Sequence, residues 1–321
     1  MSKIPVIIDC DPGHDDAIAL LIALASDKID LRGITTVGGN QTVEKTTENA
    51  LKVLELCQRT GVPVVSGRSN PLMNKLRVAQ DIHGESGMDG PVLPHSKTKP
   101  LNMRAVEFIA QQVEKSEEKM VLVAVGPFTN IGTFLLAYPE LHHKIEKIHV
   151  MGGGVYEGNR TQLAEFNVWN DPEAARVVAQ SNIPVHFFGL DVTHRAIIYK
   201  DEFKLFRDEP GPVFQFVADL LDFFSISYMN DRKLKGCPMH DSCAVASLIY
   251  PEMFTGYSSF IDVDIDGAKT RGACVVDLRP EFNRLNKDNG FFYMDVDRPK
   301  FLQLIIDSCR ILESKLDGGM K

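Results

Sequence analysis

The chain has 321 residues, of which 44% are hydrophobic and 24% are charged, an ordinary composition for a globular protein. Its formal net charge of −8 and its lack of basic stretches exclude the electrostatic footprint of a nucleic-acid-binding protein. Its apolar runs are too short to span a bilayer, and the N-terminus shows no signal-peptide pattern. We therefore predict one domain over residues 1–321, with neither a membrane nor a nucleic-acid partner.

The first two thirds of the chain alternate strand-like and helix-like runs. The strand-like runs are rich in branched apolar residues and cover 4–8, 29–37, 63–66, 120–125, 148–151 and 183–188. Helix-like runs lie between them at 16–26, 42–58, 104–117, 128–137 and 172–180. This order predicts an α/β fold in which helices flank a mostly parallel, Rossmann-like central sheet.

The rest of the chain has a different pattern. Residues 67–102 are weakly patterned and rich in proline, and loops this long inside a compact domain are usually functional. We expect the centre of this stretch to fold back over a site. Later runs predict helices at 213–230 and 238–249, a hairpin formed by 258–265 and 271–278, a strand at 291–296 and a closing helix at 299–316.

Four aspartates fall within eight residues directly after the first strand-like run, as Asp9, Asp11, Asp15 and Asp16. They lie on a turn from a strand to a helix, where open α/β sheets place their ligand crevices. Carboxylates packed this closely must hold protons or share a cation, and their oxygens favour calcium or magnesium over zinc. A helix N-terminus decorated with acids is the alternative interpretation, but it explains one or two aspartates rather than four.

The acidic turn alone supplies too few ligands for calcium, which takes about six to eight oxygens. Further oxygens stand at the ends of other predicted elements: the main-chain carbonyl of Val125 follows a strand, and Asp241 opens a late helix. A simple N-cap is the alternative role for Asp241. Glu165 and Asn167 precede a helix that is marked by an N-cap aspartate and a proline at Asp171-Pro172.

Six scattered cysteines show no spacing typical of a zinc site, so we expect free thiols in a reducing cytoplasm. Cys10 is a poor candidate nucleophile, because the neighbouring carboxylates raise the pKa of its thiol.

The run Met151-Gly152-Gly153-Gly154 follows a strand but completes neither a dinucleotide-binding motif nor a P-loop. A turn beneath a ligand is the interpretation that we favour for it.

The motif D-x-D-x-G-x-D-D spans Asp9 to Asp16. It is followed in order by Gly-Gly-Asn at 38–40, the loop 83–90, the Met-Gly-Gly-Gly run, Ala-Glu-Phe-Asn at 164–167 and His-Asp at 240–241. In these motifs the chain resembles the calcium-dependent nucleoside hydrolases of the inosine–uridine-preferring type. The resemblance covers nearly the whole chain.

The resemblance implies roles for individual residues. The Ca²⁺ ligands would be Asp11, Asp16, Asp241 and the carbonyl of Val125, and Asp11 would also take a proton from a metal-bound water. His240 would donate a proton to the departing base or simply bind it. The ribose would contact Asp15, Asn40, Met151, Glu165 and Asn167, whereas the base end would face His83, His240, Tyr228 and Arg232.

The activity implied is hydrolysis of the N-glycosidic bond of ribonucleosides, with uridine and cytidine favoured and inosine as a further substrate. The resemblance also implies a homotetramer or homodimer that acts in pyrimidine salvage. One alternative is a non-catalytic, calcium-dependent nucleoside-binding protein. The other is a haloacid-dehalogenase-like phosphatase, which also begins with D-x-D after a first strand, but Gly13 replaces the usual Thr or Val of that motif.

Overall fold

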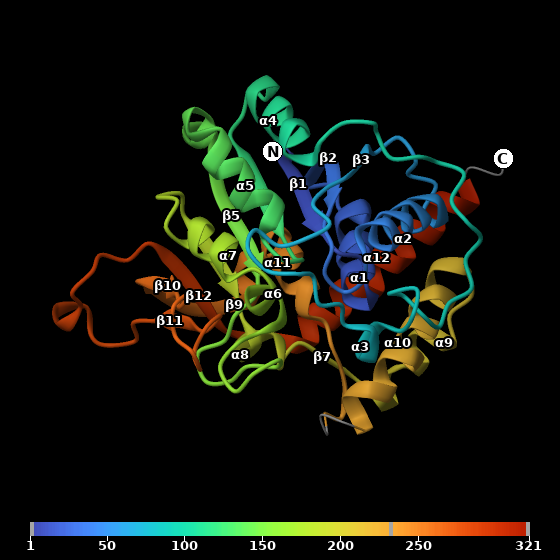
Figure 1. Cartoon of the computed structure of the whole chain (residues 1–321). Coiled ribbons are helices and arrows are strands. Elements are labelled where there is room, and N and C mark those ends of the chain that lie inside the picture. Colours follow the sequence, from blue (N-terminus) through green and yellow to red (C-terminus); the bar gives the residue numbers. More distant parts are fainter. Residues whose placement is uncertain (1–2, 231–233, 319–321) are drawn as a thin grey trace.

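The computed structural model describes residues 3–230 and 234–318, and its largest feature is an eight-stranded sheet of order β3-β2-β1-β4-β5-β6-β12-β9 (Figure 1). The pairs from β3 to β12 are parallel, and β9 joins the edge antiparallel to β12. This confirms the predicted α/β fold with a mostly parallel sheet. The strands are β1 (Ile4–Cys10), β2 (Ile29–Thr36), β3 (Val64–Ser66), β4 (Met120–Ala124), β5 (Ile145–Met151), β6 (Val185–Phe188), β9 (Phe254–Ser259) and β12 (Gly290–Val296).

Helices cover both faces of this sheet (Figure 1). One face packs against α1 (His14–Ala25), α2 (Val43–Leu56), α10 (Pro212–Asn230), α11 (His240–Ile249) and α12 (Arg298–Gly318). The other face packs against α4 (Ala105–Lys115), α5 (Thr129–Ala137) and α7 (Pro172–Ala179).

The central strand β1 contributes to both apolar layers. Val6 and Ile8 belong to one core cluster and Ile7 to the other, which is why its sequence is a continuous apolar run. The following helix, α1, is buried along its whole length and packs against α11 and α12. A helix that is apolar all round is stable only in such a buried position.

The strand order reverses between β1 and β4. The chain runs outward from β1 to β2 and β3 on one side, then from β4 to β5 and β6 on the other. Open α/β sheets bind ligands at this reversal, outside the carboxyl ends of the strands. Here those ends carry the acidic turn and Val125, whose amide donates a 2.8 Å hydrogen bond to the carbonyl of Asp9. The fold therefore brings two of the predicted metal-ligand segments side by side.

The predicted strand 258–265 is wrong as a single element. Its first residues end β9, which pairs with β12, and its remainder forms β10 (Ile261–Val263) in a separate hairpin with β11 (Cys274–Val276). The short elements were also not predicted. They are α3 (Gln80–His83), η1 (Pro139–Lys144), α6 (Phe166–Asn170), α8 (Leu190–Thr193), β7 (Ile197–Tyr199), η2 (Lys200–Glu202), α9 (Lys204–Arg207), β8 (Gly236–Pro238), η3 (Pro251–Met253) and η4 (Glu281–Asn283).

All six cysteines are buried free thiols, as expected from their spacing. Burial and the nearby Asp16 raise the pKa of the Cys10 thiol well above its usual value, which argues against a nucleophilic role. Within the described residues, no helix has the length and apolar character needed to cross a membrane.

Candidate active site

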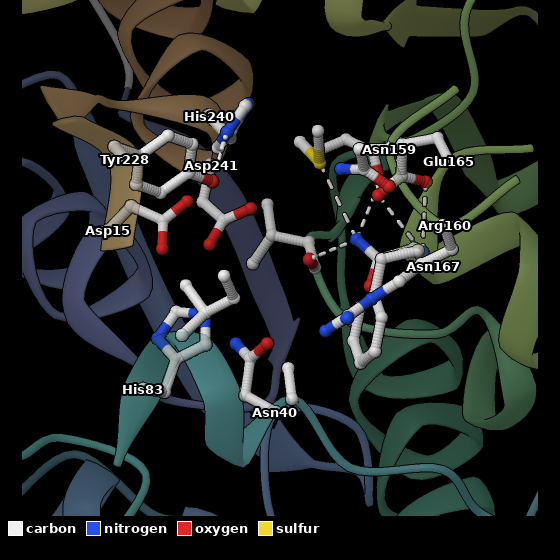
Figure 2. Close-up of a pocket in the computed structure, with 15 residues that line it drawn as sticks. Asp15, Asn40, His83, Asn159, Arg160, Glu165, Asn167, Tyr228, His240 and Asp241 are labelled. Carbon is white, nitrogen blue, oxygen red and sulfur yellow. Dashed lines mark hydrogen bonds between the residues drawn. The ribbon is translucent and has the colours of Figure 1, made fainter. Parts of the chain in front are cut away.

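A polar pocket opens beyond the carboxyl ends of β1, β2, β4 and β5 (Figure 2). Asp15 and Asp241 face one side of it, and Glu165 and Asn167 lie across from them. Segments from both ends of the chain meet here, because α1 and α11 pack against each other. The residues that line the pocket are Asp15, Asn40, Ala79, Ile82, His83, Val125, Met151, Asn159, Arg160, Glu165, Phe166, Asn167, Tyr228, His240 and Asp241.

Three carboxylates form a tight group in and beneath this pocket. Oxygens of Asp15, Asp16 and Asp241 lie within 4.8 Å of one another, and all three residues are buried. The first turns of α1 and α11 carry them, where the positive ends of the helix dipoles favour negative charge. Asp16 also accepts hydrogen bonds from the amides of Gly13 at 3.0 Å and Asp11 at 3.1 Å, which fix the acidic turn.

The carboxylate of Asp11 lies next to this group and is almost fully buried. One oxygen, Oδ2, accepts a 2.6 Å hydrogen bond from the amide of Asn40. The other, Oδ1, is buried and has no hydrogen-bond partner among the described residues. Glycines allow this close packing, since a Cβ on Gly39 would lie 2.0 Å from Oδ2 and a Cβ on Gly126 would lie 2.7 Å from Oδ1.

Burial makes the negative charges of this cluster costly. It raises the pKa of Asp11 and Asp241 well above the usual range and that of Asp15 to about 8, and repulsion between the carboxylates adds to each shift. Carboxylates in such a place are stable either as protonated acids or around a shared cation. The cluster is therefore suited to hold a metal ion at neutral pH.

The available donor atoms fit a hard divalent cation. They are oxygens only, and the unpartnered Oδ1 of Asp11 is a buried acceptor of the kind that a cation satisfies. The carbonyl of Val125 accepts a 2.8 Å hydrogen bond from Asn167 and keeps a second lone pair. The group of three includes Asp15, for which the resemblance implied a ribose contact, and Asp11 stands just outside it.

The opposite wall of the pocket is built by the short helix α6. Glu165 is its N-cap, and its side chain accepts hydrogen bonds from the amides of Asn167, Val168 and Gly153. The hydrogen bond from the amide of Gly153 brings the glycine run against Glu165. Burial raises the pKa of Glu165 to about 7, although these hydrogen bonds oppose the shift. Asn167 in turn donates to the carbonyls of Val125 and Met151, at 2.8 Å and 3.0 Å.

His240 is held at both ring nitrogens. Thr193 Oγ1 lies 2.7 Å from Nδ1, and the hydroxyl of Tyr228 lies 2.9 Å from Nε2. These contacts fix the plane of the imidazole at the edge of the pocket.

His83 enters the pocket from α3 in the long loop, which does fold back over the site as predicted. Its Nδ1 lies 3.0 Å from Nδ1 of His14, and His14 is stacked against Phe223 and Phe224 of α10. Phenylalanines on such a helix are typical of a core. These two also support the histidine that positions His83.

Comparison with known proteins identifies the family. The family model described as inosine-uridine preferring nucleoside hydrolase matches residues 6–303. The chain belongs to this family. It is 47% identical to the pyrimidine-specific ribonucleoside hydrolase RihA of Escherichia coli O1:K1 over 306 residues, which cover 95% of this chain and 97% of the relative. RihA of E. coli O127:H6 has the same identity and coverage.

Solved nucleoside hydrolase structures share the fold. A purine-preferring ribonucleoside hydrolase from Gardnerella vaginalis is 34% identical, with a TM-score of 0.90 over 96% of this chain and 99% of that one. An inosine-guanosine nucleoside hydrolase is 27% identical, with a TM-score of 0.89 and the same coverage. The chain is therefore an N-glycosyl hydrolase of the nucleoside hydrolase family, and the phosphatase alternative is wrong.

For this nucleoside hydrolase, the structure places all but one of the predicted site residues in or directly beside the pocket. The exception is Arg232, which lies outside the described residues. Sequence reasoning missed Thr193, Asn159 and Arg160. Thr193 lies in a one-turn helix, α8, which is too short to show a periodic pattern in the sequence. Asn159 and Arg160 could have been suggested by the polar composition of the loop between the glycine run and Glu165.

Arg160 connects two of the loops around the nucleoside hydrolase pocket. Its guanidinium forms a two-pronged ion pair with Asp81 of α3, at 3.0 Å and 3.2 Å, and lies 4.9 Å from the centre of the Phe166 ring. Paired, planar hydrogen bonds of this kind fix orientation as well as distance. The ion pair therefore fastens α3, and with it His83, to the loop that precedes Glu165.

Proposed function

We propose that this protein hydrolyses pyrimidine ribonucleosides to ribose and the free base, using a calcium ion held by Asp11, Asp16, Asp241 and the carbonyl of Val125. One observation carries the proposal: buried carboxylates from both ends of the chain converge beneath a pocket that is lined with hydrogen-bonding groups. The identity to relatives named pyrimidine-specific supports the choice of base.

Asp11 is the proposed general base. A Ca²⁺ ion at this cluster would lower the pKa of a water molecule and hold it near the anomeric carbon. The carboxylate of Asp11 has capacity both to contact the ion and to accept the proton, because its Oδ1 has no hydrogen-bond partner among the described residues and its Oδ2 accepts from the amide of Asn40. General-base assistance of this kind contributes about 10²–10⁴-fold to a rate.

The ribose lies between the two walls in this proposal. Asp15 on one side and Asn167 on the other bind its hydroxyls, and Glu165 stabilises the positive charge that develops on the sugar in the transition state. Asn40 and Met151 complete the lining beneath the sugar. These side chains are held by main-chain contacts, so little reorganisation is needed at the moment of reaction.

The base lies at the end of the pocket that holds His240, Tyr228 and His83. A departing pyrimidine anion needs a proton, and imidazole titrates near neutral pH. The hydroxyl of Tyr228 is hydrogen-bonded to Nε2 of His240. We therefore infer that the Tyr228 hydroxyl donates the proton to the base and is then reprotonated by His240.

This relay predicts a leaving-group effect for Tyr228→Phe. Turnover of uridine should fall by up to about 10²-fold, the lower end of the range for general-acid catalysis. Turnover of 4-nitrophenyl riboside should hardly change, because nitrophenolate departs without a proton. Initial-rate measurements with both substrates test this, and an equal loss on the two would assign Tyr228 to binding rather than to proton transfer.

The metal requirement gives a second prediction. Removing divalent ions with a chelator should abolish uridine hydrolysis, and adding calcium should restore it, because the buried carboxylates otherwise hold protons. The assay measures released ribose from uridine, cytidine and inosine, with and without chelator. Full activity in the chelated protein would contradict the calcium proposal.

The same panel tests the remaining alternative, a calcium-dependent nucleoside-binding protein. That alternative predicts that nucleosides bind, as calorimetry would detect, without release of ribose. Higher efficiency on inosine than on uridine and cytidine would contradict the pyrimidine preference alone. Assembly as a homotetramer or homodimer in the cytoplasm also remains a proposal, and light scattering of the purified protein tests the assembly.

A further inference from the structure

A second pocket, separate from the active site, is lined by four segments of the chain and gathers cationic side chains from two of them. The cations come from the loop that leads to α3 and from the loop between β10 and β11, and the lining is completed by the end of α6 and the loop that precedes this helix. Among the residues that the structure describes, no acidic one lines this pocket, although the whole chain carries a net charge of −8. Its lining residues are Asn74, Lys75, Arg77, Thr161, Trp169, Asn170, Ala268, Lys269 and Arg271.

Most of the positive charge in this pocket is not neutralised. Arg271 pairs with Glu173, but Lys75, Arg77 and Lys269 form no ion pair with any described residue. The guanidinium of Arg77 instead lies 4.6 Å from the centre of the Trp169 ring. A pocket elsewhere on the surface shows the usual balance, with three cationic and three acidic lining residues: Lys3, Arg32, Lys115, Asp30, Glu117 and Glu118.

Hydrogen bonds fix both walls of the cationic pocket. On one wall, the side chain of Asn170 accepts from the amide of Arg77 at 3.2 Å and donates to its carbonyl at 3.1 Å. On the other wall, Asp264 shapes the β10–β11 loop by accepting from the amide of Gly267 and the hydroxyl of Thr270. Asp264 is thus engaged within its own turn, and the second acid of this loop, Asp266, does not line the pocket, whereas Lys269 does.

We propose that this pocket binds a small anion through a phosphate group, either inorganic phosphate or a phosphomonoester. Guanidinium and ammonium groups form charge-assisted hydrogen bonds to phosphate oxygens, and Asn74 and Thr161 add neutral donors. The chain as a whole has a net charge of −8, which disfavours a nucleic acid as the ligand. The pocket shares no lining residue with the active site, which makes it a distinct binding site.

The chain carries its own reporter for this site, since Trp169 is its single tryptophan. The test is a fluorescence titration of the whole protein with inorganic phosphate and, separately, with glycerol 3-phosphate. A chelator is present so that the carboxylate cluster holds no metal, and sodium chloride at matched ionic strength is the control. We expect a saturable change with at least one of the two phosphates and none with chloride. Saturation by glycerol 3-phosphate alone would identify a phosphomonoester as the ligand.

Charge variants assign the signal to the pocket. The double variant Lys75→Gln and Lys269→Gln removes two cations and should weaken phosphate binding about tenfold or more, because each hydrogen bond to a charged group contributes substantially. The matched control is the double variant Lys3→Gln and Lys115→Gln, which removes two cations from the other pocket, the one with three cationic and three acidic lining residues. The affinity of this control for phosphate should be unchanged. The proposal is overturned by an unsaturable response, by an equal response to chloride, or by equal affinities in the two double variants. None of these results depends on hydrolytic activity.

Discussion

Replacing Asp11 with asparagine is expected to abolish uridine hydrolysis while leaving the protein folded. The amide side chain keeps an oxygen for the amide of Asn40, so the hydrogen bond at the end of β1 survives. It also removes one of several repelling carboxylates from a buried cluster, which should not lower stability. The base itself is lost, and with it about 10²–10⁴-fold in rate.

The measurement for Asp11→Asn is the turnover number at saturating uridine and saturating calcium. Excess calcium compensates for the weaker metal binding that follows from the loss of one carboxylate. Asp9→Asn provides a matched control two residues earlier, near the end of β1. Asp9 is equally buried, but its Oδ1 accepts hydrogen bonds from Thr35 and Asn130, two side chains that are not part of the pocket. Retained turnover in Asp11→Asn, or an equal loss in both variants, would contradict the role of Asp11 as base.

The sequence predicted the acidic end of the site well because that end is local. A buried strand, a turn containing glycine and a buried helix follow one another within the first 25 residues, and this local order brings Asp11, Asp15 and Asp16 close together. Asp241 was a candidate ligand from its place at the start of a predicted helix and from the resemblance, but no local pattern indicates that α11 packs against α1.

The opposite end of the pocket was less predictable, since its geometry depends on short elements. Helices α3, α6 and α8 have four or five residues each, too few for a periodic pattern to register. They nevertheless position His83, Glu165 and Thr193. The ion pair between Asp81 and Arg160 could not be predicted from the sequence either, because its two residues are 79 positions apart and lie in or beside irregular loops.

Loss of the 2′-hydroxyl from the substrate is expected to lower the catalytic efficiency steeply. A site built to bind a hydroxyl rejects an analogue that lacks it by about 10⁴-fold, because its buried polar groups are left unpaired. Here those groups include Asp15 and Asp241, which are almost fully buried. We therefore expect the enzyme to hydrolyse deoxyuridine with a catalytic efficiency about 10⁴-fold below its efficiency on uridine.

Combining this substrate pair with a variant tests whether the discrimination arises at Asp15. Asp15→Asn should strongly lower the catalytic efficiency on uridine but change it little on deoxyuridine, which has no 2′-hydroxyl to engage the carboxylate. The ratio of the two efficiencies should therefore shrink in the variant, since the interaction energy of a pair is lost once either partner is removed. An undiminished ratio would mean that the hydroxyl is recognised elsewhere in the pocket. Equal efficiencies of the unaltered enzyme on both nucleosides would show that the buried carboxylates do not bind the sugar diol at all.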